Sequence, residues 1–227
     1  VSVQIENDNV QELQVISGTF NAEYGKALTG VINMVTKDGG SQLDGSIHIY
    51  SGDYTTKDPI FNNLDRLTIS EDYSISANIS GPLLSGKISF YSSGRVNSSQ
   101  GWLNGLQTFN IYGDTVFTDN NNNKYFDSGD ENKTPFYKSL NWNNAWSTQN
   151  KLLFQLRPST ILKLNTILNS QQSQDYNHAL QFVSNGQLTN LEKGKLFIIS
   201  LSHSFSPTSF FQFNLSQFQR NYDSYLF

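Results

Sequence analysis

One stretch of sequence predicts how the rest of the chain is arranged: Gly18-Thr-Phe-Asn-Ala-Glu-Tyr-Gly25-Lys-Ala-Leu-Thr-Gly30-Val-Ile-Asn-Met-Val-Thr36-Lys-Asp-Gly-Gly40. Its glycines lie around Ala22 and Tyr24, and glycines at this density allow backbones to approach one another closely. Residues 31–36 then form an almost continuous apolar run, interrupted by Asn33. This run predicts a strand that is buried on both faces. Residues 1–16 before it predict short strands, or a strand with one helical turn.

The stretch resembles the end of the plug domain of TonB-dependent outer-membrane receptors, just before the first strand of their barrel. The matching positions agree in both residue type and spacing. They are Val10, Leu13, Val15, Gly18, Asn21, Ala22, Tyr24, Gly25, Gly30, Val31, Ile32, Asn33, Met34, Val35, Thr36 and Lys37. Residues 20–25 and 37–40 look most like the large Oar-like receptors, which carry a carboxypeptidase-regulatory-like domain before the plug.

The resemblance implies a fold, a division into domains and a role for the matching residues. The fold is mainly β, a fragment of a transmembrane antiparallel β-barrel preceded by the end of a small α/β plug domain. Residues 1–40 are the C-terminal part of the plug, and residues 41–227 are about the first seven barrel strands. The resemblance further implies a set of plug-packing residues that do not contact substrate: Gly18, Ala22, Tyr24, Gly25, Gly30, Asn33 and Thr36.

Composition excludes several classes of protein. The 227 residues are 37% hydrophobic and 13% aromatic, which is enough for a core, but no run reaches the roughly 18 apolar residues of a membrane-spanning helix. The absence of cysteine removes disulfides, thiol catalysis and thiolate metal sites. A net charge of -4, without any cluster of Lys or Arg, argues against a nucleic-acid partner. The first ten residues contain no signal peptide, so we expect either that a signal has been removed or that the chain begins inside a gene product, and the family resemblance implies the second.

From residue 44 onward, apolar and polar side chains alternate with a period of two. This pattern predicts strands with one apolar and one polar face, as found in a soluble antiparallel sheet or in a membrane barrel wall. Seven such strands are predicted, and an odd number cannot close as bacterial barrels do. Their centres lie near Ile47, Ile75, Phe90, Phe154, Leu164, Ile199 and Phe213.

The connections between these strands alternate in length. The predicted turns at 81–86, 157–160 and 206–209 are short, and the polar regions 97–147 and 170–194 are long. Short turns on one side and long loops on the other are typical of transmembrane barrels. Aromatic residues near the segment ends suit interfacial girdles; they are Tyr73, Phe205, Phe210, Phe211 and Phe218. Phe218 is out of phase with Phe211 and Phe213, which predicts a bulge there or the end of the membrane-embedded part.

The longest loop contains a candidate calcium site. Oxygen-bearing residues lie at the offsets 1, 3, 5, 7, 9 and 12 that a wrapped calcium loop requires. They are Asp119, Asn121, Asn123, Tyr125 through its carbonyl, Asp127 and Asp130. Lys124 stands where such loops have Gly, and Asp130 stands where they have Glu. The alternative is a solvated Asn-rich turn, and a bound calcium would have a structural role in ordering the loop.

Four aromatic residues flank this loop, and they are candidates for stacking on a sugar or peptide or for the outer membrane interface: Trp102, Tyr112, Trp142 and Trp146. The sequence contains no convincing catalytic constellation. His48, His178 and His203 are far apart, and no Ser has the context of a nucleophile elbow. We therefore expect a protein that is not an enzyme and that requires no cofactor.

The leading hypothesis is a part of a TonB-dependent receptor in the bacterial outer membrane, which binds and actively imports a scarce solute through a plugged barrel. The resemblance implies three kinds of partner: membrane lipid, the TonB energy-coupling complex acting on an N-terminal box outside this chain, and a solute, peptide or glycan. The alternatives are a secreted, calcium-stabilised β-sandwich adhesion module, a polysaccharide hydrolase on a β scaffold, and a passive porin or signalling receptor. A sandwich predicts strands of about 5 to 6 residues.

Overall fold

The structure of the protein is a computed structural model. It describes residues 9–17, 30–84, 86–106, 115–118, 124–127, 137–183 and 186–226, of which the backbone alone is described at 17, 30–33, 106, 115–118 and 124–127. The described part is mainly β, with antiparallel sheets and no α-helix. No helix in these ranges is long and apolar enough to cross a membrane.

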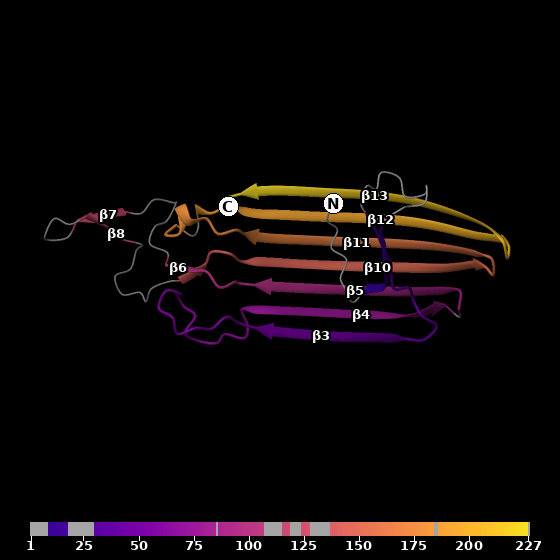
Figure 1. The fold of residues 1–227 in the computed structure, drawn as a ribbon, viewed down its shortest axis with the longest axis horizontal. Helices are drawn as coiled ribbons and strands as arrows, with labels where there is room; N and C mark the ends of the chain where they lie inside the picture. Colours follow the sequence, from indigo (N-terminus) through magenta and orange to yellow (C-terminus); the bar gives the residue numbers. More distant parts are fainter. Residues whose placement is uncertain are drawn as a thin grey trace.

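The main element is one seven-stranded antiparallel sheet (Figure 1). Its strands follow one another in the order of the sequence, each paired with the next. They are β3 (Asp44–Gly52), β4 (Asp72–Leu84), β5 (Ile88–Ser99), β10 (Asn143–Arg157), β11 (Thr160–Gln174), β12 (Thr189–Ser206) and β13 (Ser209–Tyr225). All seven predicted strands are confirmed. The sheet is not closed into a barrel, and β3 and β13 form its two edges.

The two ends of the sheet, where the chain turns from one strand to the next, are very different (Figure 1). At one end, residues 85–87, 158–159 and 207–208 connect consecutive strands. At the other end the connections are residues 53–71, 100–142 and 175–188. The predicted alternation of short and long connections is therefore confirmed. The long connections contain the pairs β6 (Asn104–Leu106) with β9 (Tyr137–Ser139) and β7 (Thr115–Thr118) with β8 (Lys124–Asp127), and the 3-10 helix η2 (His178–Leu180).

The strands extend further into the polar regions than the alternation predicted. β11 continues to Gln174 and β12 begins at Thr189, both inside the region predicted as a polar loop. Backbone pairing continues there because each strand has a neighbour to pair with, whatever its side chains are. On β13, for example, the apolar row of Phe211, Phe213 and Leu215 gives way to Gln217 while pairing with β12 continues.

The prediction of a bulge at Phe218 is wrong. The register between β12 and β13 is unbroken from Phe211 to Tyr225, with Phe218 opposite Leu196, and its irregularity lies between Ser204 and Ser206 beside the turn. Because side chains alternate along a regular strand, Phe218 lies on the other face from Phe211 and Phe213. It is also in mid-strand, so it does not belong to a girdle at a strand end.

A separate two-stranded sheet precedes the large one and is formed by β1 (Val10–Ser17) and β2 (Gly30–Thr36). We call this pair the N-terminal hairpin. The strand predicted at 31–36 is confirmed, but Met34 and Val35 are exposed, so the prediction of burial on both faces is wrong for these two residues. β2 has β1 as its sheet partner, and among the described residues no further strand pairs with it. The described residues do not show a plug domain.

Candidate functional site

The register of the sheet assigns every strand residue to one of two faces. Residues directly opposite in an antiparallel pair share a face, so one face can be followed from strand to strand. We call the first face the polar face; its row across the middle strands includes Ser76, Ser93, Ser147, Gln149 and Asn169. We call the second the apolar face; it includes Ile47, Ile75, Leu152, Leu164, Ile199 and Phe213.

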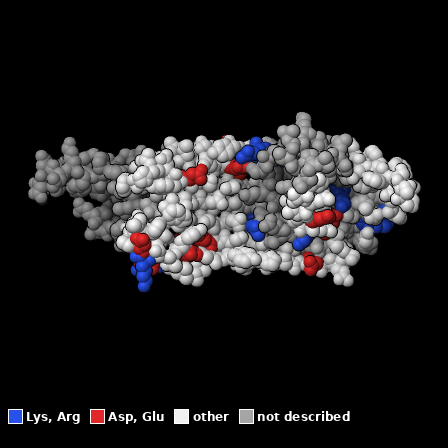
Figure 2. Space-filling view, viewed as in Figure 1, with Lys and Arg blue, Asp and Glu red and all other residues white. Residues whose placement is uncertain are grey.

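Burial on these faces is the reverse of what a soluble sheet shows. The side chains of Ser76, Ser93, Ser147, Gln149 and Asn169 are buried. Ile47 and Ile75 on the apolar face are exposed, and Ile199 is 42% exposed. No described residue forms a second sheet against the apolar face. Figure 2 shows that charged side chains are few and scattered over one face of the molecule.

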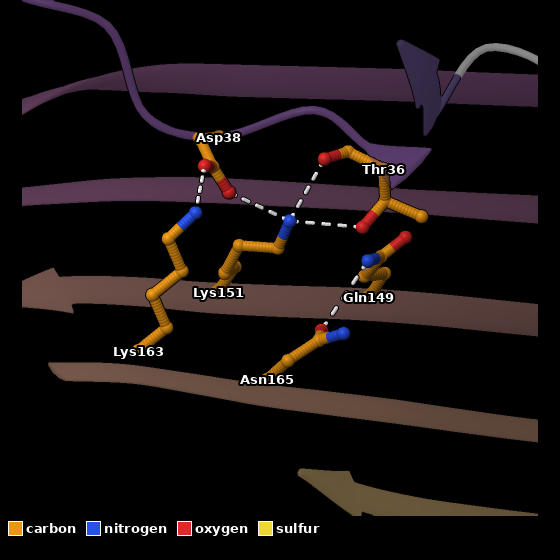
Figure 3. A network of polar contacts seen from close by, with 6 residues as sticks. All are labelled: Thr36, Asp38, Gln149, Lys151, Lys163 and Asn165. Atoms are coloured by element: carbon orange, nitrogen blue, oxygen red, sulfur yellow. Dashed lines mark hydrogen bonds and ion pairs between the residues drawn. The ribbon is translucent and has the colours of Figure 1, made fainter. Parts of the chain in front are cut away.

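The N-terminal hairpin is attached to the polar face through Lys151 of β10 (Figure 3). The Lys151 side chain is 9% exposed. Its Nζ donates to the Thr36 carbonyl at 2.9 Å, to the Thr36 Oγ1 at 2.8 Å and to the Asp38 Oδ1 at 2.7 Å. These contacts use all three donors of the ammonium group, as a buried charge requires.

Asp38 joins two cations from neighbouring strands. Its second oxygen, Oδ2, accepts from the Lys163 Nζ of β11. Burial raises the pKa of the Asp38 carboxyl, but the hydrogen bonds and charges of Lys151 and Lys163 together outweigh burial and hold this pKa below its ordinary value. Asp38 is therefore ionised at neutral pH. We call Thr36, Asp38, Lys151 and Lys163 the lysine clamp.

Two further contacts hold the hairpin against the same face. Asn9, directly before β1, is buried and its Oδ1 accepts from the Tyr91 hydroxyl at 2.8 Å. After the clamp, the chain passes so close to β5 that a Cβ added to Gly39 would lie 2.5 to 2.8 Å from backbone atoms of Phe90. Glycine is needed there because any side chain would push the segment off the sheet.

The polar face beside the clamp contains buried acceptors that have no hydrogen-bond partner among the described residues. Gln149 is 2% exposed; its Nε2 donates to the Asn165 Oδ1 at 3.2 Å, and its Oε1 has no partner. The Ser93 hydroxyl is likewise unpartnered and lines a cavity of about 10 Å³ next to Asn9. Such a volume holds about one water molecule. The contact between the hairpin and the sheet is thus polar and suited to hydration.

The structure describes only some of the plug-packing residues that the sequence predicts. Gly18, Ala22, Tyr24 and Gly25 lie outside the described residues, and Gly30 and Asn33 are described by their backbone in β2. Thr36 is the member whose side chain is described, and it accepts a hydrogen bond from Lys151. The packing role of the set stays a prediction.

The candidate calcium site also stays a prediction. Asp119, Asn121, Asn123 and Asp130 lie outside the described residues, and Tyr125 and Asp127 belong to β8, where their backbone pairs with β7. The described part of the chain contains no group of three or more His, Asp or Glu residues that could hold a metal ion. Because most of the loop is not described, that finding says nothing about it.

The aromatic candidates do not share one site. Trp102 lies in the connection 100–142 and contacts Phe61 edge to face. Trp142 precedes β10 and donates through its Nε1 to the Gln174 Oε1 at 3.2 Å. Trp146 belongs to β10 on the apolar face, opposite Val96 and Ser170. Tyr112 lies outside the described residues.

Sequence reasoning missed the lysine clamp. Lys151 and Asp38 are separated by 113 residues, and neither belongs to a recognisable motif. The available signal was a charge in the row of polar side chains on β10, together with the acidic residue after β2. Comparison of the chain with models of protein families, with curated proteins and with solved structures found no match.

Proposed function

We propose that this chain is part of a TonB-dependent receptor of the bacterial outer membrane, combining the end of the plug with consecutive strands of the barrel wall. The whole receptor would bind a scarce solute and import it actively. The observation that carries the proposal is the reversed polarity of the sheet, with apolar side chains exposed and polar side chains buried. A sheet of this kind is stable where its apolar face meets hydrocarbon and its polar face meets water or a polar plug.

The extent of the apolar face supports the same proposal. On β13 the apolar row covers Phe211 to Leu215 next to the short turn, and the rest of the strand is polar on that face up to Asp223. A strand needs about 9 to 11 residues to cross a bilayer at a tilt, and β10 to β13 have 15 to 18. In the proposed receptor, the polar ends would extend beyond the membrane on the side of the long connections.

The lysine clamp would give the plug a defined position. A buried ion pair adds little net stability, because removing two charges from water is costly, but it favours one arrangement over others. The clamp combines one carboxylate with two lysines from adjacent strands, and polar side chains such as Gln149 and Asn165 lie beside it. Transport in the proposed receptor would then be binding followed by a gated movement of the plug, without covalent chemistry.

The β-sandwich adhesion module is disfavoured by two observations. Six of the seven strands of the large sheet have 12 to 18 residues, where a sandwich predicts about 5 to 6. A sandwich also requires a second sheet over the apolar face, and none is present among the described residues. We therefore retain one function.

The test uses neighbouring residues that point to opposite faces of β12. The chain has no cysteine, so Ile199→Cys and Ser200→Cys each introduce a single thiol for labelling in intact outer membranes. We expect the thiol of the Ile199→Cys variant to resist a charged, water-soluble maleimide and to react with a lipid-soluble one. The thiol of the Ser200→Cys variant should show the opposite preference. Equal reaction of both thiols with the charged reagent would refute the membrane wall.

A further inference from the structure

We propose that the long connections form a binding platform for neutral oligosaccharides, centred on Phe61 and Trp102. This inference deepens the proposed function by naming a ligand class. It rests on that function, which assigns the end of the sheet with the long connections to the cell exterior. Three features support the platform. Two ordered loops each carry an aromatic residue, the two loops contact each other, and the contact leaves polar and aromatic groups exposed.

The first loop is closed around Phe61 by its own backbone. Thr56 N donates to the Leu64 carbonyl at 2.8 Å, which joins the two ends of the loop, and Leu64 is buried as its anchor. Inside the loop, Phe61 N donates to the Asp58 carbonyl at 3.1 Å. Asn63 has a φ of 56°, a left-handed conformation that Asn tolerates better than most residues. Phe61 is therefore presented by an ordered loop.

The second loop fixes Trp102 from both sides. Gly101 before it has a φ of 70°, and a Cβ at this position would lie 2.5 Å from the Asn141 Oδ1. Leu103 after it donates through its N to the same Asn141 oxygen at 3.1 Å, and its carbonyl accepts from Leu140 N at 2.8 Å. Asn141 thus binds the backbone after the indole and lies close against the glycine before it.

The two loops meet through a pair of rings and a pair of amides. The ring centroids of Phe61 and Trp102 are 5.7 Å apart and the planes are inclined at 65°. Beside them, Asn62 Nδ2 donates to the Asn104 carbonyl at 3.1 Å, and Asn104 Nδ2 donates to the Asn62 carbonyl at 3.3 Å. These reciprocal bonds join segments that are 42 residues apart.

The contact leaves the groups that a sugar recognises. Phe61 remains 37% exposed and Trp102 42% exposed, so part of each ring is available to the C–H groups of a sugar. The Oδ1 atoms of Asn62 and Asn104 have no partner among the described residues, and each can accept a bond from a hydroxyl group. The platform residues carry no charge, which favours a neutral ligand. Rigid aromatic residues also lower the entropic cost of binding.

The third long connection lies against the same loops. A Cβ added to Gly105 would be 2.8 Å from the carbonyl oxygen of Gln181. The next residue, Phe182, is exposed. The connection 175–188 therefore lies next to the connection 100–142 at Gly105. With two aromatic residues, Phe61 and Trp102, the platform offers stacking positions for more than one sugar unit.

The test measures binding of defined probes to the purified protein in detergent by isothermal titration calorimetry. The probes are the hexasaccharides of the cello-, malto-, xylo- and chito- series. We expect at least one of them to bind, and Trp102→Ala to weaken that binding about tenfold or more through loss of stacking. Trp146→Phe, on the apolar face, is the matched control and should bind as the unaltered protein does.

Three results would overturn the platform. They are the absence of binding to all four series, binding that Trp102→Ala and Phe61→Ala both leave unchanged, and binding of apolar peptides in place of glycans. Trp102→Tyr keeps an aromatic ring if the Ala variant fails to fold, and it should retain part of the affinity. Thiol labelling of β12 separates the two proposals: the normal labelling pattern without glycan binding refutes the platform alone, and glycan binding with equal labelling refutes the receptor alone.

Discussion

The two faces of the seven-stranded sheet consist of the same strands, yet their side chains are placed in opposite surroundings. Among the described residues, five apolar side chains are buried, against ten polar or charged ones. The buried polar groups lie mainly on the polar face, under or near the N-terminal hairpin. The Ile, Leu and Phe side chains of the apolar face are exposed on β3, β4 and β13 and half-buried on β10 and β11. In water, such a distribution forfeits the hydrophobic contribution that usually dominates folding. The comparison indicates that the two faces meet different solvents.

The largest effect is expected from Asp38→Ala, which breaks the contact on the polar face. It leaves the buried Lys151 ammonium without its counter-charge, and losing one partner of a buried charge pair costs roughly 2 to 5 kcal/mol. We expect the backbone amides of β2 to exchange with deuterium roughly 30-fold faster or more, while those of β11 stay protected.

Lys151→Met is the informative companion to Asp38→Ala. It removes the buried charge itself and keeps an apolar chain of similar length, so no uncompensated charge remains. Asp38 keeps its bond to Lys163. We expect a clearly smaller gain in exchange than for Asp38→Ala. Equal effects would show that the clamp does not work as a buried ion pair.

A charge placed on each face of β12 in turn tests which face meets lipid. An Arg facing lipid at the middle of the bilayer costs about 2 to 4 kcal/mol, so Ile199→Arg should strongly reduce the amount of folded protein in the outer membrane. Ser200→Arg places the same charge on the polar face and should have little effect. The readout is the fraction of protein that runs as the folded, heat-modifiable form on a gel; similar losses for both variants would contradict the assignment of faces.

A third prediction concerns the path of the chain between the hairpin and the sheet. Gly39→Ala puts a methyl group against the Phe90 backbone at 2.5 to 2.8 Å, and overpacking of this kind costs typically 1 to 3 kcal/mol. Gly52→Ala is the control, because a Cβ there has nothing within 4 Å. We expect limited proteolysis to cut around residue 39 faster in the Gly39→Ala variant alone.

The pH dependence of the hairpin contact follows from the lowered pKa of Asp38. The ionised Asp38 carboxylate stabilises the contact fully when the pH is above 3.8, the ordinary pKa of this carboxyl. This stabilisation is lost as the pH falls through the lower pKa that the carboxyl has in the folded protein. Exchange protection of β2 should therefore be constant from pH 7 to about 4 and decrease below that. Asp38→Asn should abolish this acid-dependent step, and a step near pH 6 would point to a different group.

The sequence was sufficient for the seven strands, because a period of two persists wherever one face is apolar. It failed at the strand ends, where residues such as Gln172 and Gln217 continue the ladder without the apolar signal, and at Phe218, where an apolar residue on the polar face looked like a break. The lysine clamp could not be predicted, because no local pattern reports which strand Asp38 will reach. The platform aromatic Trp102 was a candidate, but its partner Phe61 and the amides of Asn62 and Asn104 depend on how two loops meet.

The smallest effect is expected at a second ion pair on the polar face, which also joins a carboxylate to a basic side chain but has different surroundings. Arg220 of β13 donates to both oxygens of Glu192, at 2.8 and 2.9 Å, but it lies on the outermost strand in contact with solvent. Water solvates the Arg220 guanidinium there, so the pair contributes little. We expect Arg220→Ala to leave thermal stability and β2 exchange unchanged. If Arg220→Ala increased β2 exchange as much as Asp38→Ala does, burial of Lys151 would not explain the large effect at the clamp. The covered and the open part of the polar face would then not differ in the way proposed.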